Sequence, residues 1–206
     1  MNNNFIIRLA TVNDAEGLLA VYKPYVETTA STFEYDVPSV DEFRKRINAI
    51  IPEYPWLVCE REGVIVGYAY AHKHRERVAY QWSPESTIYL SKEMHGTGIA
   101  RIMYEAVFEI LKLQGFINVF ASVLSTNINS NRFHKAMGFE EIGLFKNIGY
   151  KYEAWHSNYW YQLSLSEHTL NPPAPKKMAE VVGDGNIETI LKNANLRINQ
   201  LAGAVS

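Results

Sequence analysis

Residues 85–101 contain the residue types whose order says most about chemistry. A run that alternates like a strand, residues 86–90, is followed by the loop His95-Gly96-Thr97-Gly98 and then by a long helical pattern. Glycines allow a backbone to approach a ligand closely, and the N–H groups at the start of a helix favour an anion, above all a phosphate. The segment therefore predicts an anion-binding turn. The alternative is a glycine-rich turn without a ligand.

The glycine loop differs from the two best-known nucleotide-binding loops. No Gly-Lys-Ser/Thr sequence ends it, as in a Walker loop, and it lacks the third glycine of the dinucleotide-binding fingerprint. No metal site is expected, because His72 and His74 lie two residues apart without a cluster of further ligands. Cys59 is the single cysteine, which excludes an internal disulfide, and it is expected to be an inert core thiol.

The elements that position this loop follow from the spacing of apolar residues. Residues 99–113 form the clearest amphipathic helix. Ser39 and Glu42 have the spacing of a capping box, and Pro24 predicts a kink or an early end of the first helix. Strands are expected at residues 5–9, 56–60, 64–71, 86–90, 119–123, 139–145 and 155–165, and helices at 14–26, 39–51, 99–114 and 130–137. The fold class is therefore α+β.

The C-terminal part of the chain predicts a division into a domain over residues 1–166 and an extension over 167–206. The proline-rich residues 171–177 indicate an extended linker. Beyond the linker, apolar residues alternate at spacings of four and three, which fits a two-heptad amphipathic helix: Ile187, Leu191, Ala194, Ile198 and Leu201. Such a helix either packs on its own domain, or frays, or forms an arm onto a second subunit.

Composition and charge bound the class of protein. The 206 residues are 47% hydrophobic and 20% charged, which is ordinary for a soluble globular chain. A net charge of -2 lacks the electrostatic signature of a nucleic-acid partner, and no apolar run approaches the roughly 20 residues that span a bilayer. The start, Met1 to Asn4, lacks a signal-peptide pattern. A cytoplasmic protein without nucleic-acid or membrane partners is expected.

The strand, the glycine loop and the long helix together resemble the acetyl-CoA motif of the Gcn5-related N-acetyltransferases (GNAT). In that family Gln/Arg-x-x-Gly-x-Gly/Ala cradles the pyrophosphate, and here the motif reads His95-Gly96-Thr97-Gly98-Ile99-Ala100, with histidine in the leading position. A second stretch, Asn127 to Phe139, resembles the family's Asn…Tyr…Gly-Phe segment, which borders the coenzyme.

This resemblance implies acetyl-CoA as the co-substrate, no metal, and a GNAT fold with a mixed, mostly antiparallel sheet flanked by helices. It also implies which residues contact the coenzyme: Ile88, Tyr89, Leu90, His95, Gly96, Thr97, Gly98, Ile99, Ala100, Arg101, Asn127 and Ser130.

Longer segments resemble a narrower family, the phosphinothricin and methionine sulfone or sulfoximine N-acetyltransferases. These segments are 54–58, 79–89 with Glu-Ser-Thr-Ile-Tyr at its end, 134–139 and 149–156 with Trp-His at its end. The resemblance covers residues 5–165 and not the tail. It implies transfer of an acetyl group to the α-amino group of a small amino acid analogue, by a homodimer with residues 150–160 near its interface.

Acetyl transfer requires that the amine lose a proton and that the leaving thiolate gain one. No Ser-His-Asp or Cys-His pair is evident, so direct attack by the amine is simpler than an acyl-enzyme. The resemblance assigns the general base to Glu85, and the alternative is an exposed charge at a strand end. His134 either protonates the thiolate, shapes the thiol pocket, or is a packing residue. A main-chain N–H of residues 88–90 would stabilise the oxyanion.

Specificity for the acceptor is expected from the loop before Glu85. Arg75, Arg77 and Tyr80 lie in that loop, and an arginine fork pairs with a carboxylate or phosphinate. The resemblance adds Phe33 as a pocket aromatic; solvated loop charges are the alternative for the arginines. Two other functions remain open. One is acetylation of a polyamine or a protein N-terminus; a polyamine site should be acidic, which Arg75 and Arg77 disfavour, whereas the N-terminus stays open. The other is a non-catalytic acetyl-CoA-binding module, which Glu85 and Gly98 disfavour.

Overall fold

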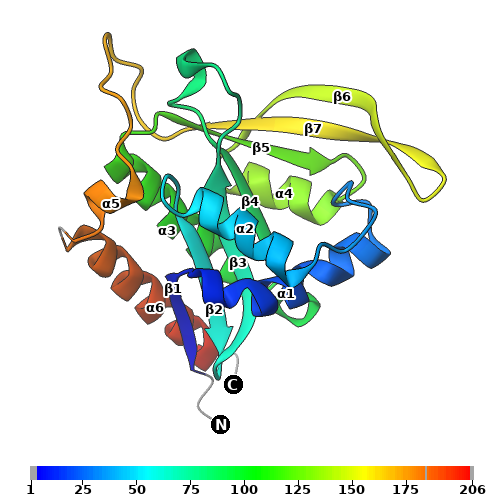
Figure 1. Cartoon of the computed structure of the whole chain (residues 1–206), viewed down its shortest axis with the longest axis horizontal. Coiled ribbons are helices and arrows are strands. Elements are labelled where there is room, and N and C mark those ends of the chain that lie inside the picture. Colours follow the sequence, from blue (N-terminus) through cyan, green and yellow to red (C-terminus); the bar gives the residue numbers. More distant parts are fainter. Residues whose placement is uncertain (1–3, 184, 205–206) are drawn as a thin grey trace.

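The computed structural model describes residues 4–183 and 185–204. A seven-stranded sheet has the order β1-β2-β3-β4-β5-β7-β6 (Figure 1). Neighbouring strands are antiparallel except for β4 and β5, which are parallel. The strands are β1 (Phe5–Leu9), β2 (Trp56–Arg61), β3 (Val64–His72), β4 (Glu85–Leu90), β5 (Asn118–Leu124), β6 (Glu140–Lys151) and β7 (Ala154–Ser164). The predicted α+β class, with a mostly antiparallel mixed sheet, is confirmed.

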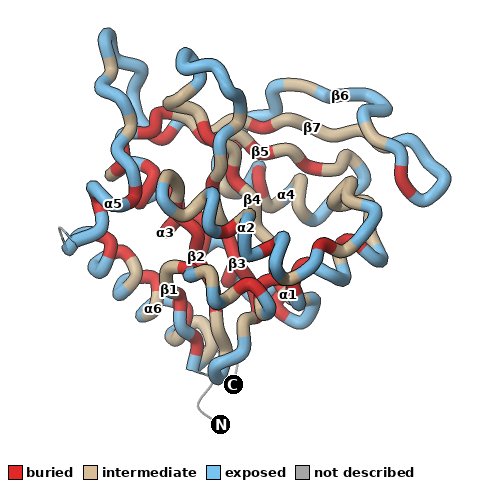
Figure 2. The backbone as a smooth tube through the Cα atoms, in the orientation of Figure 1, coloured by how far each residue is buried: buried red, intermediate tan, exposed pale blue. Residues whose placement is uncertain are grey.

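Helices cover both faces of this sheet. Helices α1 (Ala15–Thr28) and α2 (Val40–Ile50) pack on one face, over Trp56, Val58 and Tyr68. The other face carries α3 (Ile99–Gln114), α4 (Ile128–Ala136), the short α5 (Met178–Val181) and α6 (Asn186–Ala204). Figure 2 shows the buried residues concentrated along the central strands and the inner sides of the helices. Among the described residues, no helix is long and apolar enough to cross a membrane.

Two elements differ from the sequence expectation. The strand expected at 139–145 is longer, because β6 continues to Lys151 and pairs with β7 as far as Ala154 in a long hairpin. Pro24 does not end the first helix, since α1 continues to Thr28. A proline removes its own N–H from the helix ladder and crowds the carbonyl four residues before it, yet helical turns continue after Pro24, and the hydroxyl of Thr28 donates a hydrogen bond to the Pro24 carbonyl at 2.6 Å. The cap at Ser39 is confirmed, with its hydroxyl accepting from the Glu42 N–H.

The C-terminal helix covers the free edge of the sheet at β1. Asn195 accepts a hydrogen bond from the Ile7 N–H at 2.6 Å and donates one to the Ile7 carbonyl at 2.9 Å. Asn199 does the same at Phe5, at 3.0 and 2.9 Å. One turn of a helix rises by nearly the same distance as two residues of a strand. Asparagines one turn apart can therefore each bond the backbone of every second residue of β1, as a neighbouring strand would.

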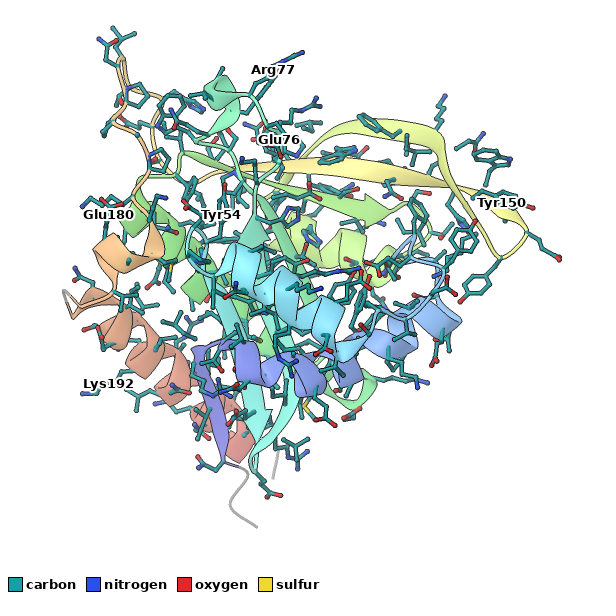
Figure 3. The ribbon with its side chains drawn as sticks, in the orientation of Figure 1. Tyr54, Glu76, Arg77, Tyr150, Glu180 and Lys192 are labelled. Atoms are coloured by element: carbon teal, nitrogen blue, oxygen red, sulfur yellow. The ribbon has the colours of Figure 1, made fainter. Side chains whose placement is uncertain are left out.

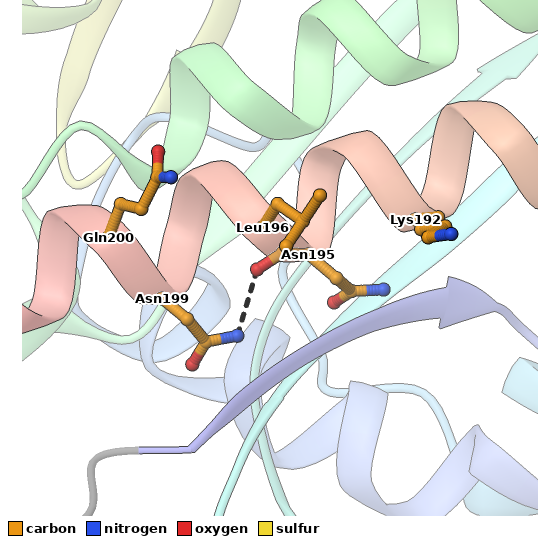
Figure 4. Close-up of a pocket in the computed structure, with 5 residues that line it drawn as sticks. All are labelled: Lys192, Asn195, Leu196, Asn199 and Gln200. Carbon is orange, nitrogen blue, oxygen red and sulfur yellow. Dashed lines mark hydrogen bonds between the residues drawn. The ribbon is translucent and has the colours of Figure 1, made fainter.

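Figure 4 shows the side chains of Asn195 and Asn199 on α6 and the hydrogen bond that Asn199 donates to the backbone carbonyl of Asn195. The shallow groove beside it is lined by α6 alone, by Lys192, Asn195, Leu196, Asn199 and Gln200. Because the two asparagines already bond the backbone of β1, the groove is a structural seam between α6 and the sheet edge.

The apolar face of α6 packs on its own chain. The core that α3 also forms buries four apolar residues of α6: Ile187, Ile190, Ala194 and Ile198. On the surface, Arg197 of α6 forms an ion pair with Glu105 of α3, with 2.5 Å between Nη2 and Oε2. The linker is also docked, since the indole of Trp82 donates to the Pro173 carbonyl at 2.7 Å. Of the placements considered for the tail, this structure has the helix on its own body. Residues 1–3, where the N-terminal pattern was considered, lie outside the described residues, as do 184, 205 and 206.

Candidate active site

The glycine loop presents free backbone donors at the start of α3. Gly96 has a φ of 74° and Gly98 a φ of 88°, both in the left-handed region that favours glycine. Within the described residues, no protein acceptor takes the N–H groups from Gly96 to Ala100, and the first helical bonds run from Arg101 and Ile102 to the Gly98 carbonyl. Free donors at the N-terminus of a 16-residue helix fit a diphosphate.

His95 is held against α1 and the end of β4. Its Nε2 lies 2.8 Å from the hydroxyl oxygen of Tyr25 and 3.2 Å from the Leu90 carbonyl oxygen. Cavities lie on both sides of the glycine loop: one of about 580 Å³ towards α1 and one of about 500 Å³ towards α6. His95 therefore anchors the loop, and a contact of its side chain with a ligand stays a prediction.

Strands β4 and β5 separate just where the candidate base lies. Their only ladder pair is Glu85 with Phe120, next to a hydrogen bond from the Phe120 N–H to the Pro84 carbonyl at 2.9 Å. Figure 1 shows β5 turning away from β4 beyond this point. On the side facing β5, the backbone of residues 88–90 is therefore left without a strand partner. The stretch of β4 from Glu85 towards the glycine loop that lacks a β5 partner is the opening between the two strands.

Glu85 is a half-buried carboxylate with one protein partner. Its side chain is 19% exposed, and its Oε2 lies 3.2 Å from Nδ1 of His74. The Arg75 Nε–H donates in turn to Nε2 of His74 at 3.3 Å. The ring of His74 stacks on Phe120 and meets Trp160 edge-on. Glu85 thus lies at the apex of the opening with one oxygen bonded, and it is not an exposed strand-end charge.

Sequence reasoning missed His74, which was weighed only as a metal ligand. The register of the strands would have found it, because His72 on β3 pairs directly opposite Glu85 on β4. His74 lies two residues beyond the end of β3, and from there its ring reaches the same carboxylate. That register depends on pairing between separate strands, so the sequence alone does not reveal it.

The start of α4 faces the loop between α1 and α2. The Asn127 side chain accepts from the Ser130 N–H at 3.1 Å, which caps α4, and its amide donates to the Ser31 hydroxyl at 3.4 Å. His134, one turn after Ser130, is buried among the rings of Tyr104, Phe139 and Tyr161. Asn127 therefore links α4 to the loop between α1 and α2, which also carries Phe33.

Burial lowers the pKa of His134, although the hydrogen bond to the Ser130 carbonyl opposes this effect. The imidazole is therefore neutral at pH 7. Its Nδ1 lies 2.8 Å from that carbonyl, which makes Nδ1 the protonated nitrogen, and Nε2 lies 3.4 Å from the Tyr104 hydroxyl. The ring carries no proton poised for donation at Nε2. Its role as an acid stays a prediction.

The residues expected to bind the acceptor are spread over two segments. Arg75 reaches His74 and stacks over Tyr80 at 5.5 Å, whereas Arg77 projects outward from the loop (Figure 3). Phe33 lies on the other side, with its ring against Gly149 of β6. Among the described residues, neither Arg77 nor Phe33 hydrogen-bonds to Glu85.

The long β6–β7 hairpin holds the loop that carries Phe33. Lys151 is buried, and its Nζ donates to the carbonyls of Val26, Thr29 and Thr32 at 2.8, 2.9 and 3.0 Å. The Tyr35 hydroxyl donates to the Tyr150 carbonyl from the same loop, and Figure 3 shows Tyr150 at the hairpin end of the molecule. The hairpin thus fixes the loop that carries Phe33, a predicted acceptor-binding residue.

The model of the acetyltransferase (GNAT) domain matches residues 7–160. The chain belongs to the GNAT acetyltransferases. This acetyltransferase is 34% identical, over 83% of its length and 91% of the relative, to a phosphinothricin N-acetyltransferase of Streptomyces viridochromogenes. It is 29% identical, over 77% of its length and 94% of the relative, to an L-methionine sulfoximine/L-methionine sulfone acetyltransferase of Pseudomonas aeruginosa.

A solved structure supports the same placement of this GNAT chain. A phosphinothricin acetyltransferase from Sinorhizobium meliloti in complex with acetyl-CoA superimposes with a TM-score of 0.78 at 32% identity, over 83% of this chain and 94% of that one. The predicted family is therefore confirmed, and with it an acetyltransferase activity. The match ends at residue 160, so α5 and α6 lie outside the part of the chain that the family model describes.

Proposed function

We propose that this acetyltransferase moves the acetyl group of acetyl-CoA to the α-amino group of a small amino acid analogue such as phosphinothricin, methionine sulfone or methionine sulfoximine. The observation that carries the proposal is the opening between β4 and β5, with a half-buried carboxylate at one end and free N–H donors at the other. The names of the relatives favour amino acid analogues as acceptors.

Acetyl-CoA supplies an activated acetyl thioester. The N–H groups from Gly96 to Arg101 hold its diphosphate, and Asn127 and Ser130 border the coenzyme on the α4 side. Glu85 accepts a proton from the substrate ammonium, and the electron pair left on nitrogen forms the bond to the acetyl carbon. The carbonyl oxygen becomes an oxyanion in this step, and a main-chain N–H of residues 88–90 binds it. The oxyanion then re-forms the carbonyl as the carbon–sulfur bond breaks, and the nitrogen's surplus proton passes to the departing sulfur.

For His134 we favour the role of shaping the thiol pocket. A general acid must carry a transferable proton at working pH. The lowered pKa and the bond from Nδ1 to the Ser130 carbonyl leave His134 neutral, with its proton directed away from Nε2. A buried ring packed against three aromatic side chains instead gives the pocket a fixed wall.

The substrate proposal is tested by following free-thiol release from acetyl-CoA across a panel of amines. We expect turnover with methionine sulfone and phosphinothricin, and little with a polyamine or an N-terminal peptide. Turnover confined to the polyamine or the peptide would contradict the proposal, and so would no turnover with any amine.

Arg77→Ala is expected to lower kcat/KM about ten- to hundredfold for the two acidic analogues. Hydrogen bonds to a charged group are worth roughly 1.5–3 kcal/mol, and an amine without an acidic group should lose much less. Lys73→Ala is the matched control, because Lys73 is a cation of the same loop that pairs with Glu76 at 3.1 Å. Equal losses for every amine would make Arg77 structural and exclude it from acceptor binding.

The same proposal includes a homodimer in the cytoplasm. β6 is the outermost strand, and it exposes a row of apolar side chains: Ile142, Leu144, Phe145, Ile148 and Tyr150. An exposed apolar row on a free strand edge favours pairing with a second copy. Within residues 150–160, the exposed Tyr152 and Trp155 lie at the turn of the same hairpin.

Light scattering at micromolar concentration is expected to give twice the chain mass of 23.5 kDa. Ile148→Glu should shift the mass towards the monomer, because it places a charge on the apolar row. Leu170→Glu is the control, since Leu170 is 95% exposed in the linker, away from β6. A monomer mass for the unmodified protein would contradict the dimer.

A further inference from the structure

A side chain that faces Glu85 has no part in the function proposed so far. The imidazole of His74 lies between two charged groups, with Nδ1 3.2 Å from Oε2 of Glu85 and Nε2 3.3 Å from Nε of Arg75. A guanidinium has donors only. Nε2 must therefore accept from Arg75, which leaves the ring proton on Nδ1, where it points at the carboxylate. The order of donation runs from Arg75 through His74 to Glu85.

The ring of His74 is also fixed in place by its neighbours. It stacks on Phe120 with centroids 5.0 Å apart and planes 20° apart, and it meets Trp160 edge-on at 5.1 Å. The His74 side chain is 11% exposed. Phe120 is the residue of β5 that pairs with Glu85, so the stacking surface belongs to the same point of the sheet as the carboxylate.

The other histidine near this point is engaged elsewhere. His72 pairs with Glu85 across the two strands, but its Nδ1 lies 3.1 Å from the Lys73 carbonyl, and its ring packs on Tyr70. Among the described residues, His74 is the side chain that hydrogen-bonds to Glu85. The carboxylate therefore has one oxygen bonded and the other without a protein partner.

We propose that His74 is a positioning residue for Glu85, with Arg75 selecting the ring tautomer that donates to the carboxylate. This inference rests on the proposed role of Glu85 as the base. With Oε2 held by the imidazole, the carboxyl group keeps one rotamer, and Oε1 is left for the substrate. The N–H bond of the substrate ammonium then breaks towards Oε1, and the electron pair stays on nitrogen.

Two substitutions of His74 separate the donor from the ring. His74→Phe keeps an aromatic ring between Phe120 and Trp160 but removes the donor, and it should lower kcat about tenfold, the factor that a hydrogen bond to a charged group typically controls. KM for acetyl-CoA should stay unchanged. His74→Asn places an amide N–H near the position of Nδ1 and should recover most of kcat, which a purely structural role of the ring would not allow.

A double-mutant cycle that combines His74→Phe with Glu85→Gln tests whether His74 acts through the carboxylate. We expect His74→Phe to have no further effect on kcat in the Glu85→Gln background, because no base is left to position. Equal losses in both backgrounds, or a full kcat for His74→Phe alone, would overturn the positioning role while leaving the base intact. Full kcat for Glu85→Gln alone would overturn the base itself, and the positioning role with it. Melting curves of all variants report loss of folding separately.

Discussion

Glu85→Gln is expected to lower kcat about 10²-fold or more, with little change in the affinity for acetyl-CoA. An α-amino group is largely protonated near neutral pH, and only the neutral amine attacks, so proton removal lies on the reaction path. The amide keeps the size of the carboxylate and can still accept from His74, but it cannot take a proton. General-base catalysis is typically worth about 10²–10⁴-fold. Steady-state kinetics with saturating acetyl-CoA measure the effect.

Glu109→Gln is the matched control for this prediction. Glu109 lies on the exposed side of α3, away from the opening between the strands, and undergoes the same change from acid to amide. It should leave kcat unaltered. If Glu85→Gln retained full kcat across the pH range, another group or water alone would remove the proton. If the affinity for the coenzyme fell together with kcat, Glu85 would act in binding as well.

Residues that act through local rules could be read from the sequence. Gly115 ends α3 with the positive φ that is common at a helix C-terminus, and Gly98 precedes its first residue. Ser39 caps α2 through the Glu42 N–H, as its spacing predicts. Glu85 could be placed at the start of a strand that leads into the glycine loop, because strand, loop and helix are consecutive.

Contacts between distant segments could not be predicted in this way. The two bonds from Asn195 to Ile7 join residues 188 positions apart, and nothing in the helical pattern indicates which residues of an exposed face will reach a strand edge. Lys151 likewise looks like an ordinary surface charge in the sequence, yet it is buried beneath three carbonyls of residues 26–32. Both depend on the final packing of whole elements.

The site combines both kinds of information. The sequence predicted the donors of the glycine loop and the candidate base, but the partner of that base depends on the register between β3 and β4 and on Phe120 from β5. The surroundings of Phe33, a predicted acceptor-binding residue, depend on the hairpin, in which β6 is longer than the expected strand. Catalytic groups on consecutive elements are thus easier to predict than the neighbours that orient them.

Gly98→Val should raise the dissociation constant for acetyl-CoA at least about 10²-fold. Gly98 has a φ of 88°, which a β-branched residue scarcely adopts, and a Cβ there would lie 3.0 Å from Cδ2 of Leu201 on α6. The turn must change its backbone, which moves the free N–H groups away from the diphosphate. The loss of two hydrogen bonds to the charged diphosphate, at roughly 1.5–3 kcal/mol each, accounts for a rise of this size in the dissociation constant. Titration of the folded protein with acetyl-CoA measures it.

Gly115→Val separates the loss of ligand contacts from backbone strain. Gly115 ends the same helix with a φ of 90°, and a Cβ there meets nothing within 4 Å. Both variants pay a similar conformational penalty, so both should lower the melting temperature, but Gly115→Val should bind acetyl-CoA like the parent protein. If Gly98→Val also titrated like the parent, the diphosphate would bind elsewhere than at the start of α3. The glycine loop contacts α1 through the hydrogen bond between His95 and Tyr25, and Gly98 faces Leu201 of α6 on the other side. A changed backbone at Gly98 therefore displaces the N–H donors next to it.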